Sequence, residues 1–302
     1  MTPHKHKTKR SWRGFRALLS LTRGVPATYQ DYSDESFSEN VALPDHRNLS
    51  KHFGLTPKAI PLPFWYISAQ ETHIELMFRK RFPYPLAGTV HVENSLEKIT
   101  EFNPEKPVNV RTTVFCEAKP EGSPTGTFVT EFEQEGEVFV RNESVYLWKK
   151  GGKKSKKKKS EPEIFEADWS KISDINPTEG QVYARLSGDQ NPIHTSSLIA
   201  KVFGFKSKII HGWNLVYRLY ATALENGPEP KRFTVRFHKP VGFPGKVMIE
   251  GKRIEPSSLI IQSLSPDRKV KQVSFEAESN LSDGDKKRFD EIKNHRMRHK
   301  TP

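Results

Sequence analysis

Apolar residues recur with a helical period in two separate parts of the chain, residues 64–81 and 211–227. Basic residues end the first segment, as at many helix C-termini, and Gly227 stands where the second helix should stop. Each half is therefore predicted to contain one long helix. The apolar positions are Trp65, Ala69, Ile74 and Met77 in the first helix, and Leu215, Val216, Leu219, Tyr220, Ala223 and Leu224 in the second.

Short runs that mix β-branched and aromatic residues with polar ones follow both predicted helices, and turn residues separate several of them. This order of a helix followed by strands occurs twice. It predicts an α+β fold built from a duplicated unit, in which a sheet wraps around one buried helix. The predicted strands are residues 86–102, 108–118, 126–134 and 137–150 in the first unit, and 231–240, 245–255, 257–265 and 270–279 in the second.

A lysine-rich stretch, residues 149–163, separates the two halves. It combines eight lysines with two adjacent glycines and offers little apolar surface to bury, so we interpret it as a linker. Attraction to the phosphates of a carrier or to an anionic membrane surface is the alternative role. The expected organisation is a basic, partly flexible arm (1–54), an N-terminal unit (55–148), the linker, a C-terminal unit (164–281) and a polar tail (282–302).

The net charge of +13 suggests a nucleic-acid partner, but its distribution argues against one. Residues 1–30 carry +7, residues 149–159 carry +8 and residues 283–302 carry +3, so the remaining residues are net negative. Nucleic-acid-binding domains normally carry their positive charge on the folded surface. We therefore expect no nucleic-acid partner.

The chain has 302 residues and one cysteine, Cys116, which excludes an intrachain disulfide and favours a reducing compartment. No apolar run approaches the roughly 18 residues of a membrane span, so we expect a soluble cytoplasmic protein without stable membrane insertion. The basic first thirty residues lack the pattern of a secretory signal. An organelle transit peptide is the alternative interpretation of this arm.

The stretch "YARLSGDQNPIH", Tyr183 to His194, is the main candidate for a functional site. Residues 189–192 alone would be a polar turn whose proline opens a short helix over 192–203. The turn is unusual because it places a carboxylate and an imidazole five positions apart. A second histidine, His211, precedes Gly212 at the start of the predicted apolar helix.

This stretch resembles the signature of the MaoC-like dehydratase family, which includes the type-2, (R)-specific enoyl-CoA hydratases. The signature is Y-x-x-[LIV]-[ST]-G-D-x-N-P-[IL]-H, and the matching residues are Tyr183, Leu186, Ser187, Gly188, Asp189, Asn191, Pro192, Ile193 and His194. The resemblance implies a double hotdog fold over roughly residues 55–281. It also implies a lyase that acts on acyl-CoA or acyl carrier protein thioesters in fatty-acid metabolism.

Adding water to a 2-enoyl thioester requires a base, an acid and stabilisation of the developing oxyanion. We expect Asp189 and His194 to hold the water and to transfer its proton. The backbone N–H of Gly212, at the start of a helix, would bind the thioester oxygen. Tyr183, Ser187, Gly188, Asn191 and Pro192 would support the turn, whereas His211 is interpreted equally as a packing residue or a substrate contact.

No metal or other cofactor is expected, although a metal held by Asp189, His194 and His211 is conceivable. Ser187 lacks the Gly-x-Ser-x-Gly context of a hydrolase nucleophile. The first unit has no second copy of the motif, so we expect it to complete the core and shape the groove for the acyl chain. His73, His91 and Asn94 are its candidate lining residues.

The leading hypothesis is reversible hydration of 2-enoyl thioesters and dehydration of (R)-3-hydroxyacyl thioesters. A non-catalytic acyl-thioester-binding protein is the alternative, and a polybasic protein that binds nucleic acid or acidic lipids is a third hypothesis. The duplicated unit predicts either a monomer of two fused hotdogs or a homodimer of the whole chain.

Overall fold

The computed structural model describes residues 31–86, 88–117, 123–148, 166–243 and 245–280. The first thirty residues, the predicted linker 149–163 and the predicted tail 282–302 lie outside this description. No helix in the described ranges is long and apolar enough to cross a membrane.

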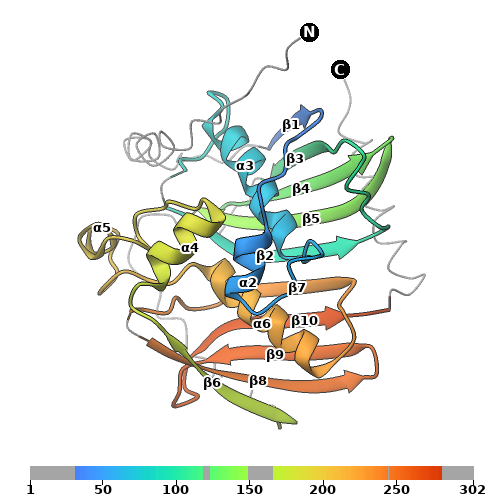
Figure 1. Ribbon diagram of the computed structural model, residues 1–302. Coiled ribbons are helices and arrows are strands. Elements are labelled where there is room, and N and C mark those ends of the chain that lie inside the picture. Colours follow the sequence, from blue (N-terminus) through green and yellow to red (C-terminus); the bar gives the residue numbers. More distant parts are fainter. Residues whose placement is uncertain (1–30, 87, 118–122, 149–165, 244, 281–302) are drawn as a thin grey trace.

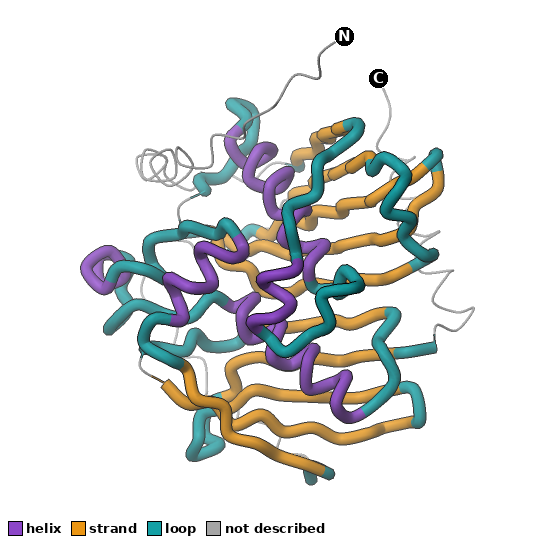
Figure 2. Tube along the Cα trace, in the orientation of Figure 1, coloured by secondary structure: helices purple, strands orange, loops and turns teal. Residues whose placement is uncertain are grey.

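A ten-stranded antiparallel sheet forms one layer, and the helices cover one of its faces (Figures 1 and 2). The strand order is β1-β3-β4-β5-β2-β7-β10-β9-β8-β6. The first half of the chain supplies β1 (Tyr32–Ser38), β2 (Thr89–Lys98), β3 (Asn109–Glu117), β4 (Thr125–Gln134) and β5 (Glu137–Trp148). The second half supplies β6 (Trp169–Ile175), β7 (Arg232–Phe237), β8 (Gly245–Glu255), β9 (Ser258–Leu264) and β10 (Lys271–Glu278).

The sheet topology confirms the predicted duplication. The order β1-β3-β4-β5-β2 in the first half is the same as β6-β8-β9-β10-β7 in the second, with the two halves joined where β2 pairs with β7. Each half also has one long helix after its first strand, α3 (Phe64–Phe78) and α6 (Gly212–Asn226). We call the two halves the N-terminal and C-terminal units.

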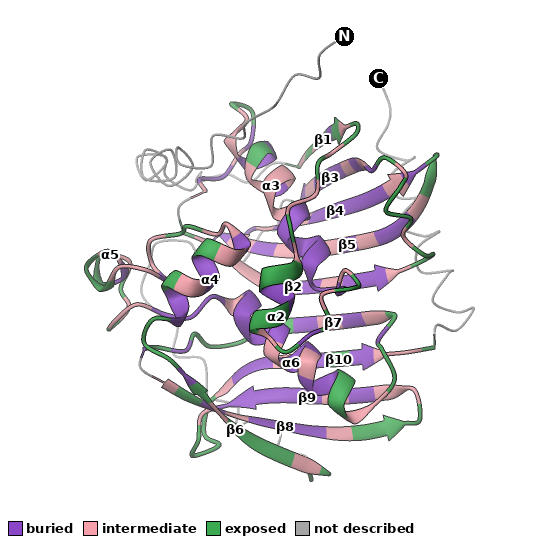
Figure 3. Ribbon diagram, in the orientation of Figure 1, coloured by how far each residue is buried: buried purple, intermediate pink, exposed green. Residues whose placement is uncertain are grey.

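Both long helices pack against the sheet as the apolar pattern predicts. One hydrophobic cluster runs across the two units and contains Trp65 and Ala69 of α3 together with Leu219 of α6. Figure 3 shows that both helices and the central strands carry buried residues. Helix α6 ends directly before Gly227, as expected. Leu224 was wrongly assigned to the buried stripe, because it lies at the exposed edge of α6.

A second, smaller cluster lies within the N-terminal unit and contains the single cysteine. Cys116 is 2% exposed and packs in the same cluster as Trp148, and burial raises the pKa of its thiol to about 12. The thiol is therefore protonated and shielded at neutral pH.

Several short elements have no counterpart in the sequence analysis. Strand β1 and helix α2 (Arg47–His52) lie within residues assigned to the N-terminal arm, while β6 and helix α4 (Glu179–Ser187) precede the candidate site. Strands β1 and β6 are the two edges of the sheet and are rich in polar residues, so the hydrophobic pattern does not reveal them.

Helices α2, α4 and α6 meet at the buried carboxylate of Glu179, which is 4% exposed. His52 Nε2 lies 2.8 Å from its Oε1, Asn214 donates a hydrogen bond to the same oxygen, and Arg218 forms an ion pair at 3.3 Å. Burial alone would raise the pKa of Glu179, but these partners outweigh it and lower the pKa to about 2. The carboxylate thus anchors the start of α4, the helix that leads into the candidate site.

We expect Glu179→Gln to destabilise the protein by about 3 kcal/mol at pH 7, because the folded state binds the ionised carboxylate more strongly than the unfolded state does. This contribution is present above pH 4.5, the ordinary pKa, and is lost as the pH falls toward 2. Urea unfolding at several pH values should show the difference between wild type and variant shrinking below pH 4.5. A difference that does not change with pH would contradict the assignment, and Glu225→Gln on the exposed end of α6 serves as control.

Candidate functional site

The site begins where α4 ends. Gly188 has a φ of 80°, in the left-handed region, and its N–H bonds to the carbonyl of Ala184 at 3.0 Å. Glycine reaches this conformation without steric cost, so the helix closes with a sharp turn. Asp189 follows immediately, and its side chain is half-buried.

Polar side chains hold the loop after Asp189 in shape. The hydroxyl of Ser187 accepts the N–H of Asp189 at 3.2 Å and donates to the carbonyl of Tyr183 at 2.8 Å. The carboxylate of Asp189 accepts the N–H of Asn191 at 3.1 Å, and the side chain of Asn191 accepts the N–H of Ile193 at 3.3 Å. The loop is therefore a chain of successive polar turns.

The proline of the motif does not open a helix, contrary to the prediction for residues 192–203. The chain makes one further turn, in which Ser196 N–H bonds to the carbonyl of Pro192, and helix α5 then covers Ser197–Val202. Ser196 accepts the N–H of Ile199 and is the true N-cap. The extra turn leaves His194 outside any helix.

His194 is 8% exposed, and its orientation is fixed by the backbone. Its Nδ1 lies 2.9 Å from the carbonyl oxygen of Ile209. Because a carbonyl only accepts, Nδ1 carries the proton and Nε2 keeps its lone pair. Gly180 of α4 packs directly on this segment, since a Cβ there would lie 2.2 Å from the carbonyl oxygen of His194.

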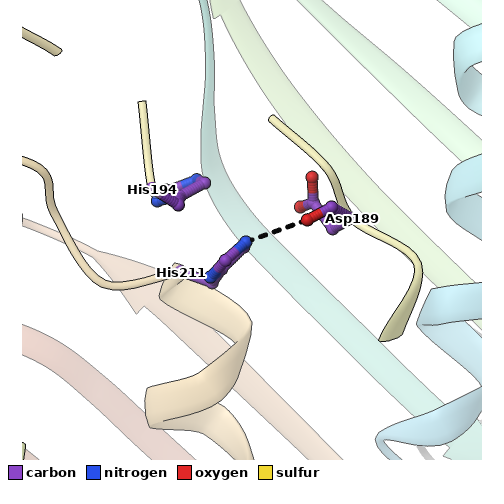
Figure 4. Close-up of side chains that lie close together, drawn as sticks. All are labelled: Asp189, His194 and His211. Atoms are coloured by element: carbon purple, nitrogen blue, oxygen red, sulfur yellow. Dashed lines mark hydrogen bonds between the residues drawn. The ribbon is translucent and has the colours of Figure 1, made fainter. Parts of the chain in front are cut away.

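His211 joins the site at the start of α6. Its ring stacks on the ring of His194, with centroids 3.8 Å apart and an interplanar angle of 27°. Its Nε2 donates to the backbone carbonyl of Asp189 at 3.1 Å, which is the dashed line in Figure 4. The ring of Tyr183, which is 1% exposed, also packs against His211, with ring centroids 4.7 Å apart. The structure therefore brings Asp189, His194, His211 and Tyr183 together.

Burial and proximity determine the charges of the three titratable groups. Burial lowers the pKa of His194, and burial together with the neighbouring His194 lowers the pKa of His211 to about 4. Burial alone would raise the pKa of Asp189, but the two histidines and hydrogen bonds from Asn191 and Gln70 lower it below its usual value. At neutral pH the site thus contains one carboxylate and two neutral imidazoles.

Among the residues that the structure describes, Asp189, His194 and His211 have the side-chain types of a metal site. One possible ligand atom of each lies within 4.8 Å of the other two. Their geometry does not fit a metal ion. The lone pair of an imidazole lies in its ring plane, and the two ring planes are stacked nearly parallel. In addition, Nε2 of His211 carries a hydrogen, which it donates to the backbone carbonyl of Asp189. The arrangement of the two rings therefore does not suit a metal held by all three residues.

Gly212 is the first residue of α6. The first turn of a helix has no preceding carbonyl to bond, so the N–H of Gly212 lies outside the backbone ladder of α6. A Cβ at this position would lie 2.9 Å from the ring of Phe237. The glycine is therefore needed for packing against β7 as well as being suited to a close approach by another group.

The N-terminal unit contributes one residue that the sequence analysis missed. Gln70, in the middle of α3, donates from Nε2 to Oδ2 of Asp189 at 3.4 Å. The two residues are 119 positions apart, and no local pattern connects them. His73 and Asn94 are fully buried and bond other residues of the N-terminal unit. His91 is of intermediate exposure, and its ring lies near those of Trp213 and Phe237 of the C-terminal unit.

Comparison with known proteins supports the motif. The model of the family described as MaoC like domain matches residues 145–257. The chain is 26% identical over 241 residues to 3-hydroxyacyl-thioester dehydratase X (HtdX) of Mycobacterium tuberculosis, covering 76% of this chain and 86% of that protein. It is also 30% identical over 162 residues to peroxisomal multifunctional enzyme type 2 of Drosophila melanogaster, covering 48% of this chain but only 27% of the fly enzyme.

Solved structures agree with the architecture. The crystal structure of HtdX has a TM-score of 0.67 at 19% identity and covers 82% of this chain and all of that one. A MaoC-like dehydratase from Phytophthora capsici has a TM-score of 0.57 at 18% identity, covering 85% of this chain and 97% of that one. The chain therefore has the hotdog α+β fold, and residues 145–257 match the model of the MaoC like domain.

Proposed function

We propose that the protein is a hydro-lyase that adds water reversibly to 2-enoyl thioesters and removes it from (R)-3-hydroxyacyl thioesters. The acyl carrier would be coenzyme A or acyl carrier protein, and the reaction would belong to fatty-acid metabolism. One observation carries the proposal: an ionised Asp189 and a neutral His194 lie within 4.8 Å of each other beside the start of α6, in a MaoC-like domain. The name of the mycobacterial relative and the (R)-specific families that residues 183–194 resemble support the reaction class.

A carboxylate oxygen of Asp189 and a ring nitrogen of His194 lie no more than 4.8 Å apart, which allows one bridging water molecule. Two hydrogen bonds of about 2.8 Å, made at the tetrahedral angle of one water, place their outer atoms about 4.5 Å apart. Asp189 can only accept a hydrogen bond, and the free Nε2 of His194 can also only accept one. A water between them therefore donates both its hydrogens and directs an oxygen lone pair outward, toward an electrophile.

In the hydration direction, the oxygen of this water attacks the β-carbon of the enoyl group while its proton passes to Nε2 of His194. The π electrons move to the thioester oxygen, which accepts the N–H of Gly212 and lies at the positive end of α6. The charge of Asp189 stabilises the imidazolium until it returns the proton to the α-carbon. Dehydration reverses these steps, and neither direction exchanges electrons with a cofactor.

The other motif residues act on the geometry of this pair. Gly188 provides the left-handed turn before Asp189, Ser187 and Asn191 bond the loop backbone, and Pro192 begins the turn that ends near His194. His211 supports both groups, since it stacks on His194 and bonds the backbone of Asp189. Tyr183 packs behind His211 and limits its movement.

We expect Asp189→Asn and His194→Gln to lower kcat/KM for crotonyl-CoA hydration by about 10²- to 10⁴-fold, because each removes a group that handles the water. Loss of the conjugated thioester absorbance measures the rate. Matched controls are Asp174→Asn and His238→Gln, which change exposed residues of the same types and should leave kcat/KM within about twofold.

An inactive wild type on all chain lengths and both carriers would contradict the proposal. Saturable binding of an enoyl thioester without turnover would then favour the acyl-thioester-binding protein. Activity that survives both substitutions in folded protein would place the chemistry elsewhere in the chain.

We expect kcat/KM to be level near neutral pH and to fall on the acid side, because protonation of His194 removes the base. Burial lowers the pKa of His194 below its ordinary value of 6.5, so the midpoint of the acid limb should lie below pH 6.5. Asp189, whose pKa is also lowered, should stay ionised through this range. Initial rates between pH 4.5 and 8 test this, and a midpoint at or above pH 6.5 would rule out a buried neutral imidazole as base.

A further inference from the structure

The interior of the N-terminal unit contains a row of polar residues where a hydrophobic core is expected. All of them are 0% exposed, and they come from α3 and from four neighbouring strands of the sheet. Buried polar groups are costly unless they bond one another, so such a row needs a reason. We call it the polar layer; it consists of His73, Asn94, Thr112, Thr130, Asn142 and Ser144.

The polar layer separates the two hydrophobic clusters of this unit. On β3, Thr112 lies between Val110 of the large cluster and Val114 of the small one. On β4, Thr130 lies in the same way between Phe132 and Phe128. Residues two apart on a strand face the same side of a sheet, so the layer crosses the inner face of the N-terminal unit as a continuous band.

Hydrogen bonds connect the layer to two tyrosines. Thr112 and Thr130 lie 2.9 Å apart through their hydroxyls, and Nε2 of His73 is 3.0 Å from Thr130. Nδ1 of His73 is 3.1 Å from the hydroxyl of Tyr146, which in turn is 3.2 Å from the hydroxyl of Tyr66. These contacts fill the region between α3 and the sheet with bonded side chains.

The fold itself does not require such a layer. The C-terminal unit has the same strand order, yet the inner positions at the centre of its strands are apolar, and a buried polar residue, Ser263, stands only at the end of this row on β9. Between α6 and the sheet lie Val247 and Ile249 of β8, Leu259 and Ile261 of β9, and Val273, Phe275 and Ala277 of β10, all in the large cluster. The polar layer is therefore a property of the N-terminal unit alone.

The tyrosine end of this network lies beside the candidate site. The ring of Tyr66 packs on Trp213, the residue after Gly212, with centroids 4.0 Å apart. One turn further along α3, Gln70 bonds the carboxylate of Asp189. When the carbonyl of a thioester lies at Gly212, the coenzyme A or acyl carrier protein attached to it is too large to enter the protein and stays at the surface. In the proposed binding mode its acyl group extends inward, past the start of α6, toward Tyr66 and Tyr146, which are 4% and 6% exposed.

We propose that the polar layer and its two tyrosines restrict the enzyme to short-chain acyl groups. This inference rests on the proposed hydro-lyase function and specifies its substrate class. A long apolar chain entering the N-terminal unit would have to displace bonded side chains and leave His73, Thr112 or Thr130 without partners, and an unsatisfied buried polar group is costly. A short chain ends before it reaches them.

The first test uses the wild-type protein and three probes, crotonyl-CoA, oct-2-enoyl-CoA and dodec-2-enoyl-CoA. We expect kcat/KM to be highest for crotonyl-CoA and at least about 100-fold lower for dodec-2-enoyl-CoA, because misfit of even a few methylenes changes specificity by such factors. Equal or higher kcat/KM for the dodecenoyl substrate would overturn the inference. Because this series needs no variant, it decides the question by itself.

The second test removes the side chain nearest the layer. Tyr146→Ala should raise the ratio of kcat/KM for dodec-2-enoyl-CoA to that for crotonyl-CoA about tenfold, because it opens space beyond Tyr66. Tyr84→Ala is the matched control: Tyr84 is buried in the small cluster against Trp148, and the ratio should not change. An unchanged ratio in folded Tyr146→Ala would count against the inference.

The two proposals fail in different ways. If no enoyl thioester of any length is hydrated, the hydro-lyase function is wrong. If crotonyl-CoA and longer substrates are hydrated by an Asp189-dependent reaction with no preference for short chains, the function stands and the chain-length inference is wrong.

Discussion

The pairing of β2 with β7 is the constraint on which the rest of the structure depends. It joins two units of the same topology into one sheet, so that α3 and α6 lie on the same face. Because of this arrangement, Gln70 of the first unit reaches Asp189 of the second, and Trp213 packs on Tyr66. The motif of the second half is therefore completed by side chains from the first.

The candidate site shows how burial separates the charges of neighbouring groups. Low solvent exposure favours the neutral form of both histidines, while the two histidines and hydrogen bonds from Asn191 and Gln70 lower the pKa of Asp189 and favour its ionised form. The result is a single negative charge beside a free imidazole lone pair. Glu179, at the other end of α4, is a second buried carboxylate, but its partners are cationic or amide groups and it has a structural part in the fold.

The hydrophobic pattern predicted α3, α6 and the eight inner strands, because each has a buried face with regular spacing. It could not predict β1 and β6, because these edge strands are mainly polar. It also placed Leu224 in the core, although the apolar stripe of α6 is no longer fully buried near the end of the helix. The residues of the site were recognisable because Asp189 and His194 are close in sequence. Gln70 was not, because only the pairing of the two units brings it to Asp189, and the polar layer likewise depends on contacts between distant strands.

The burial of Cys116 has a consequence for the chemistry of thioesters. An exposed thiolate would attack such a substrate and take over its acyl group, which would leave the protein covalently modified. With a thiol pKa of about 12, roughly one molecule in 100,000 would be ionised at pH 7, and Trp148 and its neighbours exclude the ester from the sulfur. In the proposed reaction water attacks the β-carbon, and the described fold keeps its sulfur nucleophile away from the thioester carbonyl carbon, where a thiolate would take over the acyl group.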